Sequence, residues 1–458
     1  MGGVIAQDGF AYQLWDCVRR IPKWLANPAF EYMIIEGLED YEARFFAPHA
    51  PHLHLLERYQ AKRQDLSPGE VGVIMDSFYR WDVAHPGIAR VQTLVTPRLP
   101  KSLQWLHSHA DRVRRARPFY SPFRDVEEVI SGTLEKKLTE EFGQGLGKFI
   151  ATFSEVDEQN IPDRDTAFRA FSSSLESAFP EIEPSSRKVR AAFERLCEVA
   201  QRALGEPITR EVLLQEIVKG LGEDLPLPTS FPILVRSDRD DIEASALEID
   251  ASPFCGGDIA YPPTDEWEGR LSNPLRETAA WLRRNRTSRI ALDGFYRLTT
   301  AMIIGYHLRS AHGFELEIPT RSGNWATNEH LAAEAVIDAW EINRPEVSEA
   351  IELSVCIGIL KDPSNALPRT AGTDVESTLA LHLPKAIESG KEAQGAVALI
   401  IQEVNAAVAK LAPQKIRLFF VGPAALAVAL GHRWNALPDT QLHEFINDEG
   451  RYAETAII

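Results

Sequence analysis

An acidic residue and an alternating polar pair near the start of the chain have the types and spacing of a metal-dependent hydrolytic site. Gln60 and Lys62 stand at positions i and i+2 of a predicted strand, so both side chains project from one face. Asp40 lies at the end of the preceding predicted strand, close enough to share that face across a short hairpin. A carboxylate and a side-chain oxygen can hold Mg²⁺, and a neighbouring lysine can offset charge on a phosphate. The spacing alone fits a solvated hairpin face equally well.

Two turns in the second half of the chain have the composition of anion-binding sites. Asp293–Thr299 and Val421–Ala425 each lead from a predicted strand into the start of a helix. Helix N-termini favour anions, and open α/β sheets bind ligands at the carboxyl ends of their strands. The candidate ligand-binding residues, chosen for phosphate contact or base stacking, are Tyr296, Arg297, Thr299, Arg321, Trp325, Lys361, Arg369, Gly422 and Pro423. Taken singly, each is explained better as a core or rim residue, so the pair of turns is the stronger signal.

Residues 98–124 are locally basic, with aromatic residues between the cations and Asp111 as the one acid. This composition suits contact with a nucleic-acid backbone, and a solvated helix face is the alternative. A net charge of −17 does not exclude DNA, because binding needs only a local positive field. The candidate DNA contacts are Arg112, Arg114, Arg115 and Arg117.

Length and composition limit the class of protein. The 458 residues suggest about three structural units, and 44% apolar with 25% charged residues is typical of soluble globular protein. The four cysteines lie far apart in sequence, which excludes a CxxC site and fits a reducing cytosol. The N-terminal segment lacks a signal-peptide pattern, and runs such as Ala396–Ile401 are too short to span a bilayer. We therefore expect a cytoplasmic protein without a membrane segment.

The first half of the chain divides into a mixed region and a helical region. Within residues 1–80 the pattern predicts a helix, then strands, then a helix, with strands at Tyr32–Phe46 and His54–Gln64. Residues 125–221 are predicted to be wholly helical. Gly222–Pro232 has three prolines in eleven residues and is the best candidate for a linker.

Beyond the linker, short β runs alternate with helices, which predicts an α/β region with a mostly parallel sheet. The clearest runs are Ile290–Leu292, Glu315–Ile318, Leu353–Leu360 and Ile416–Val421. The segments that begin at Ser288 and Lys415 also match each other, with Gly305 aligned on Gly431 at an offset of 126 residues. This match predicts two similar α/β lobes, although any two strand–helix units share some of the pattern.

Residues 1–80 resemble the Mrr-like PD-(D/E)xK nucleases that act in bacterial antiphage defence. The matching pieces are GFAYQ (Gly9–Gln13), EGLED (Glu36–Asp40) and YQAK (Tyr59–Lys62). The resemblance implies that Gln13, Asp40, Gln60 and Lys62 carry catalysis, with Asp40 and Gln60 as the metal ligands. Gln60 stands where the wider superfamily has glutamate, and an amide oxygen is a neutral, weaker ligand. Glu36 and Glu39 are the nearest residues that could supply the missing charge.

The second half resembles the SAVED domain over roughly residues 230–458. The resemblance rests on TAAWLRRNRTSRIALDGFYRLTTAMIIGYHL, on RSGNW and on FFVGPAALAVALGHRW. It implies two fused CARF-like lobes that bind a cyclic oligonucleotide, which agrees with the internal repeat. A nuclease followed by SAVED resembles the effector nucleases of CBASS antiphage systems.

Together these observations predict an α/β protein of three parts: a restriction-endonuclease-like core with a helical extension (1–222), a linker (223–232) and a SAVED domain of two CARF/Rossmann-like lobes (233–458). The resemblance implies a double-stranded DNA endonuclease that uses Mg²⁺ or Mn²⁺. A cyclic di- or trinucleotide from a partner nucleotidyltransferase would activate it and cause self-association. The alternatives are a restriction-type nuclease without nucleotide control and a non-catalytic nucleotide-binding scaffold.

Overall fold

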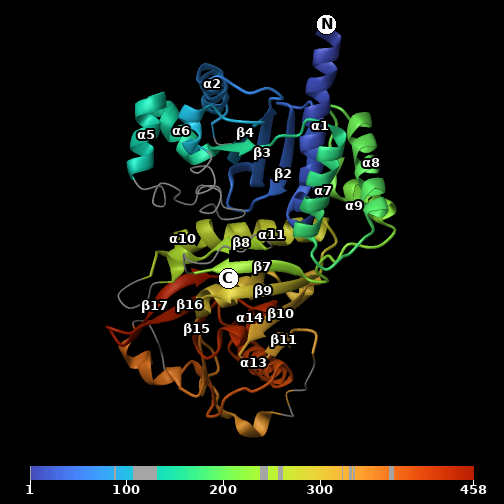
Figure 1. The fold of residues 1–458 in the computed structure, drawn as a ribbon. Helices are drawn as coiled ribbons and strands as arrows, with labels where there is room; N and C mark the ends of the chain where they lie inside the picture. The colour runs from blue at the N-terminus through green and yellow to red at the C-terminus, as the bar shows by residue number, and fades with distance from the viewer. Residues whose placement is uncertain are drawn as a thin grey trace. The chain divides into compact units, whose positions relative to one another are not determined.

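A computed structural model of the chain describes residues 2–86, 89–106, 132–237, 246–255, 261–321, 323–329, 333, 336–370 and 376–458. The chain forms two compact units (Figure 1). The first comprises Met1–Pro228 with Ile242–Leu247, and the second comprises Thr229–Asp241 with Glu248–Ile458. The main division, after Pro228, falls within the proline-rich segment 223–232. Among the described helices, none combines the length and the apolar composition needed to cross a bilayer.

A six-stranded mixed sheet in the order β5-β4-β3-β2-β1-β6 forms the centre of the first unit. β1, β2 and β3 form an antiparallel meander, and β4 and β5 continue the sheet parallel to β3. The carboxyl ends of β3, β4 and β5 therefore meet at one edge. The strands are β1 (Phe30–Ile35), β2 (Tyr41–Phe46), β3 (His54–Ala61), β4 (Ala89–Thr96), β5 (Ser154–Glu158) and β6 (Ile208–Thr209).

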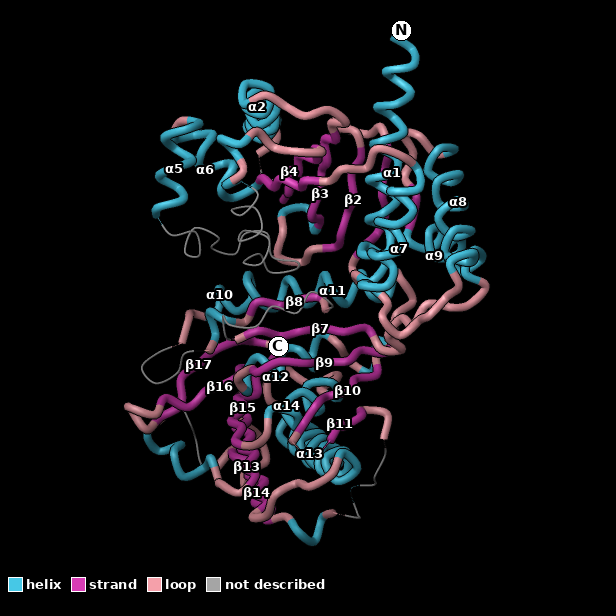
Figure 2. Tube along the Cα trace, viewed as in Figure 1, coloured by secondary structure: helices cyan, strands magenta, loops and turns pink. Residues whose placement is uncertain are grey.

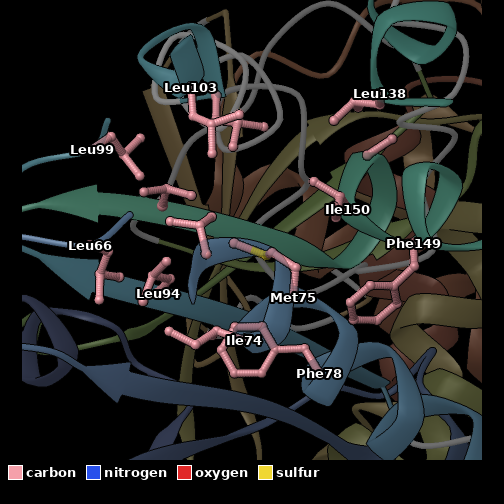
Figure 3. Packing of buried hydrophobic residues seen from close by; sticks show 14 residues of the cluster. Leu66, Ile74, Met75, Phe78, Leu94, Leu99, Leu103, Leu138, Phe149 and Ile150 are labelled. Carbon is pink, nitrogen blue, oxygen red and sulfur yellow. The ribbon is translucent and has the colours of Figure 1, made fainter. Parts of the chain in front are cut away.

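Two groups of helices enclose this sheet (Figures 1 and 2). On one side lie α2 (Pro68–Ala84), α5 (Gly132–Phe142) and α6 (Gln144–Phe153), and on the other lie α1 (Gly2–Ala26), α7 (Arg164–Ala178), α8 (Ser186–Arg202) and α9 (Arg210–Leu221). A buried apolar cluster fixes the first group: Ile74, Met75 and Phe78 from α2 meet Leu94 of β4 and Phe149 of α6 (Figure 3). Ser67 starts α2 with a reciprocal capping box to Glu70.

Two predictions for the first unit are wrong in detail. Tyr32–Phe46 is not one strand, because the chain reverses between Ile35 and Tyr41, which pair with each other. The reversal uses Glu36, whose φ of 57° lies in the left-handed region. Residues 125–221 are not wholly helical, since they contain β5 and β6. β5 reads SEVDE, and its pairing with β4 fixes a conformation that its local propensity does not favour.

The second unit contains two sheets that share one topology. The first lobe has five strands in the order β11-β10-β9-β7-β8, and the second has six in the order β12-β14-β13-β15-β16-β17. Both have a parallel core flanked by an antiparallel strand, β11 in one lobe and β17 in the other, and the second lobe has a further antiparallel strand, β12, beside β14. Each predicted β run corresponds to a strand of these sheets, although the run Leu353–Leu360 extends one residue beyond β13. The strands are β7 (Phe231–Arg236), β8 (Leu247–Asp250), β9 (Arg289–Phe295), β10 (Glu315–Thr320), β11 (Gly323–Ala326), β12 (Glu341–Asn343), β13 (Glu352–Ile359), β14 (Thr378–Leu383), β15 (Lys415–Val421), β16 (Asp439–Ile446) and β17 (Arg451–Ile457).

The two lobes join through a close crossing of α12 (Leu298–His307) and α14 (Ala424–Arg433). A Cβ on Gly305 would overlap the carbonyl oxygen of Val428, and a Cβ on Gly431 would overlap that of Met302. Gly305 and Gly431, like Met302 and Val428, are 126 residues apart, so the contact is reciprocal. The predicted duplication is therefore confirmed in space. The unit also contains α10 (Thr264–Trp267), α11 (Asn273–Arg284) and α13 (Gly390–Leu411).

Candidate functional site

The residues predicted to form a hydrolytic site converge at the carboxyl end of β3. Asp40 lies in the turn just before β2, and the pairing of Tyr41 with Tyr59 places it beside Gln60 and Ala61. The Asp40 carboxylate accepts a hydrogen bond of 2.6 Å from the backbone N–H of Ala61. It also accepts one from the side chain of Gln13 on α1, and Lys62 acts on it electrostatically. Asp40 therefore precedes β2 rather than ending a strand, but it lies beside its expected neighbours.

Gln60 is the second residue predicted to offer an oxygen ligand. Its Oε1 atom is buried and has no hydrogen-bond partner within the described part of the chain. A buried acceptor without a donor costs about 1–3 kcal/mol, so this oxygen is better satisfied by a bound cation or water. The Asp40 carboxylate and the Gln60 amide are hard oxygen donors, which fit Mg²⁺. The described residues contain no group of three or more His, Cys, Asp or Glu side chains arranged to hold a metal, so water and substrate oxygens would complete the shell.

Acidic side chains at this site carry raised pKa values. Burial raises the pKa of Asp40, and the Ala61 N–H, Lys62 and Gln13 offset only part of that effect. Burial also raises the pKa of Glu39, with Arg58 opposing the rise, and burial together with the charge of Asp40 raises the pKa of Glu36. A divalent cation would relieve these raised values, because it stabilises the ionised carboxylates.

Arg58 holds the turn that carries Asp40. Its guanidinium is buried, donates to Glu39 Oε1 at 2.9 Å and to Gln92 Oε1 at 3.1 Å, and lies 3.8 Å from the centre of the Trp81 ring. Within the turn, the Glu36 N–H donates to the Asp40 carbonyl at 2.9 Å. The sequence interpretation missed Arg58, although its position two residues before Gln60 places it on the same face of β3.

A buried ionic network fixes α1, and hence Gln13, against the sheet. Arg19 and Arg20 donate to Asp157 on β5 at 2.8 and 2.5 Å, and Arg19 also donates to Asp16 at 2.6 Å. Burial alone would raise the pKa of Asp157, but Arg20 and Arg19 outweigh it and hold the pKa well below its usual range. Tyr41, the neighbour of Asp40, donates to Asp16. The network therefore ties α1 to β2 and β5 below the site.

The first predicted turn of the second unit is filled by the chain itself. The Thr299 N–H, at the start of α12, donates to Glu444 Oε1 at 2.7 Å, and the Thr299 hydroxyl lies 3.0 Å from that of Thr455. Arg297 donates to the Cys255 carbonyl at 3.1 Å. Tyr296 is buried. This helix N-terminus therefore binds a carboxylate of β16.

The second predicted turn is open. Pro423, at the N-cap of α14, is exposed, and no side chain caps the helix. Lys361 is exposed just beyond β13, whose Gly358 pairs with Val421 of β15, so Lys361 and Gly422 lie at one edge of the sheet. A pocket of about 290 Å³ opens further along this edge, beyond β14. The sequence interpretation missed it; its lining includes Trp340, Leu383, Lys385 and Glu392.

The remaining predicted residues are spread more widely. Trp325 is buried in β11 beside Gly390 at the start of α13, and its Nε1 atom has no hydrogen-bond partner among the described residues. Arg321 is exposed between β10 and β11. The side chain of Arg369 lies outside the described residues. So do all four arginines of the predicted DNA contact: Arg112, Arg114, Arg115 and Arg117.

Both units have counterparts among known proteins. Residues 274–458 match the SAVED family, the SMODS-associated and fused to various effectors sensor domain. The chain is 25% identical to CD-NTase-associated protein 4 of Moraxella osloensis and 26% identical to that of an Acinetobacter species, covering 99% of this chain and 97% of each relative.

Solved structures match the whole fold. The Acinetobacter baumannii Cap4 SAVED/CARF-domain containing receptor with the cyclic trinucleotide 2′3′3′-cAAA is 23% identical with a TM-score of 0.77, covering 98% of both chains. The same receptor with 3′3′3′-cAAA is 22% identical with a TM-score of 0.78 and the same coverage. The predicted α/β fold class is thereby confirmed.

Proposed function

We propose that this chain is an antiphage effector of the CBASS type, in which a cyclic oligonucleotide bound by the SAVED domain activates a DNA endonuclease in the first unit. The observation that carries the proposal is the similarity to CD-NTase-associated protein 4, which extends over 99% of this chain and so includes both units. The SAVED match supports the sensor role of the second unit.

The nuclease role rests on the residues gathered around Asp40. Asp40 and Gln60 would hold Mg²⁺, which when bound supplies a Lewis acid and an activated water. Lys62 would offset the negative charge that grows on the scissile phosphate. Gln13 keeps the Asp40 carboxylate oriented through its hydrogen bond. Arg58 is a positioning residue, because it would affect cleavage only by holding the turn that carries Asp40.

The proposed ligand is a cyclic trinucleotide, because the solved Acinetobacter baumannii relative is described with two of them. We place it at the carboxyl edge of the second lobe, where the α14 N-terminus is open and Lys361 is exposed. Arg321 and Trp325 belong to the same proposal. Thr299 and Arg297 would instead support the α12 turn, since Glu444 already fills it.

Activation would proceed through assembly. A ligand can shift an equilibrium only by binding one state more tightly than the other. A ligand that completes a surface between neighbouring SAVED domains would bind the assembled protein more tightly than the unassembled one. Assembly would then place several nuclease units on one duplex at high local concentration. The messenger would come from a partner nucleotidyltransferase.

Plasmid DNA incubated with the protein, Mg²⁺ and a panel of cyclic di- and trinucleotides tests the proposal. We expect cleavage, with larger species in light scattering, only with the cognate nucleotide. Lys361→Gln should weaken nucleotide binding about tenfold in calorimetry, because a charge-assisted hydrogen bond contributes about 1.5 kcal/mol. Lys188→Gln, at an exposed position on α8 in the first unit, is the control and should bind normally. Equal cleavage without nucleotide would favour an ungated restriction-type nuclease.

A further inference from the structure

A basin of about 320 Å³ lies beside the candidate nuclease site, at the edge where β3, β4 and β5 end. Arg63 directly follows Lys62 after β3, Arg98 follows β4, and Asn160 follows β5. Tyr12, the neighbour of Gln13 on α1, closes another side. The basin therefore lies next to two proposed catalytic residues, Lys62 after β3 and Gln13 on α1.

The charges at the basin favour an anion. Arg98 is exposed, and its guanidinium has no ion-pair partner among the residues that the structure describes. Arg63 pairs with Asp8 at 2.5 Å, but both side chains are about half exposed, so this surface pair contributes about 0–1 kcal/mol and yields readily to another anion. Asp65 is the one acid in the lining, against two arginines.

The walls of the basin are held in place by the sheet. Tyr12 is buried, and its hydroxyl donates to the Gln159 carbonyl at 2.8 Å. The Leu99 N–H donates to Glu158 Oε1 at 2.5 Å, which fixes the backbone beside Arg98. The Gln159 N–H donates to the Thr96 carbonyl at 2.8 Å and continues the pairing of β5 with β4 beyond the strand ends. The Lys62 N–H, just before Arg63, donates to the Val95 carbonyl at 2.8 Å, so both guanidinium groups extend from backbone that the sheet holds in place.

We propose that this basin is a subsite for a phosphodiester group of the cleaved strand, next to the scissile phosphate, with Arg63 and Arg98 as its phosphate contacts. The proposal rests on the proposed nuclease function. Arg63 lines the basin and directly follows Lys62, so a DNA strand bound at Lys62 lies close to the basin. Guanidinium groups suit phosphate because their fork of donors matches two oxygens. Asn160 can add a neutral hydrogen-bond donor, and the buried Tyr12 ring lines the basin on the side of α1.

The salt dependence of DNA binding tests the subsite in the Lys62→Ala protein, which should bind DNA without cutting it. Fluorescence anisotropy with a labelled duplex, in Mg²⁺ and saturating 3′3′3′-cAAA, gives the slope of log affinity against log salt. Arg98→Gln and Arg63→Gln should each reduce that slope by about 0.9. Between 50 and 200 mM salt, affinity should then fall about 3.5-fold less for each contact removed. Arg202→Gln is the control, because Arg202 is also an exposed arginine but lies on α8 and pairs with Glu198.

The outcomes separate the two proposals. A reduced slope in both basin variants, with an unchanged slope in Arg202→Gln, supports the subsite. If the Lys62→Ala protein binds DNA and both basin variants keep its slope, the subsite is wrong and the nuclease proposal stands. If the Lys62→Ala protein itself binds no DNA, the nuclease proposal fails and the subsite fails with it.

Discussion

Replacing Arg58 with methionine should loosen the turn that carries Asp40. The guanidinium is only 1% exposed, and it satisfies Glu39 and Gln92 while it stacks on Trp81. Methionine retains a flexible apolar chain against the Trp81 ring, but it donates no hydrogen bond. The substitution therefore removes the donor from two acceptors and leaves Glu39 with an uncompensated charge beside Asp40.

The size of the effect follows from this burial. Removing one partner of a buried ion pair costs about 3–5 kcal/mol. Glu39 is 20% exposed, so water solvates part of its charge and the lower end, about 3 kcal/mol, applies. In a domain of about 150–250 residues each kcal/mol shifts Tm by about 2–4 °C, so the first unit should melt about 6–12 °C lower.

Differential scanning calorimetry and cleavage assays across a Mg²⁺ series measure both consequences. We expect Arg58→Met to need more Mg²⁺ for half-maximal cleavage, because Asp40 is held less firmly. Arg58→Lys keeps the charge without the fork of donors and should be intermediate. Arg80→Met on α2 removes an exposed arginine paired with Asp76 and should change neither quantity. An Arg58→Met protein with unchanged Tm and Mg²⁺ requirement would refute the argument that Arg58 anchors the turn.

Three further predictions concern single positions. Lys62→Ala should abolish cleavage and leave Tm and nucleotide binding unchanged, because Lys62 is only partly buried and its truncation opens no core cavity; full cleavage by this variant would contradict the nuclease assignment. Gly305→Ala should lower the Tm of the second unit, because the new methyl group would overlap the Val428 carbonyl, whereas Gly269→Ala, which meets nothing, should not; equal melting of the two would contradict the close crossing. Burial raises the pKa of Glu444 in the folded state, so its contribution to stability is fully present below the unfolded pKa and is lost as pH rises through the folded pKa. Glu444→Gln should remove the contribution of Glu444 to the pH dependence of Tm in thermal melts. An unaltered dependence of Tm on pH would contradict this role of Glu444.

The sequence predicted the parts of each site that lie close together along the chain. Gln60 lies on β3 and Lys62 just past its end, two residues apart, and the alternation of strands and helices beyond residue 230 needs only local periodicity. The strands of the second unit were accessible for the same reason.

Long-range pairing explains what could not be predicted. Asp157 meets Arg20 across 137 residues, and Glu444 meets Thr299 across 145, so no local pattern points to either contact. Because Glu444 accepts the hydrogen bond from Thr299, the turn before α12 is filled, whereas the similar turn before α14 is open. β5 escaped prediction because its partner strand, and not its own composition, makes it a strand.

The reciprocal glycine contact between α12 and α14 has a consequence for ancestry. In a twofold-symmetric dimer, residue i of one subunit contacts residue j of the other, and j contacts i in return. Gly305 against Val428 and Gly431 against Met302 reproduce that pattern within one chain. A single-lobe ancestor that paired through this helix would have needed one glycine, used twice. In the present chain the two glycines are separate residues, and a side chain at either one would overlap the backbone of the other lobe, so the close crossing needs glycine at both positions.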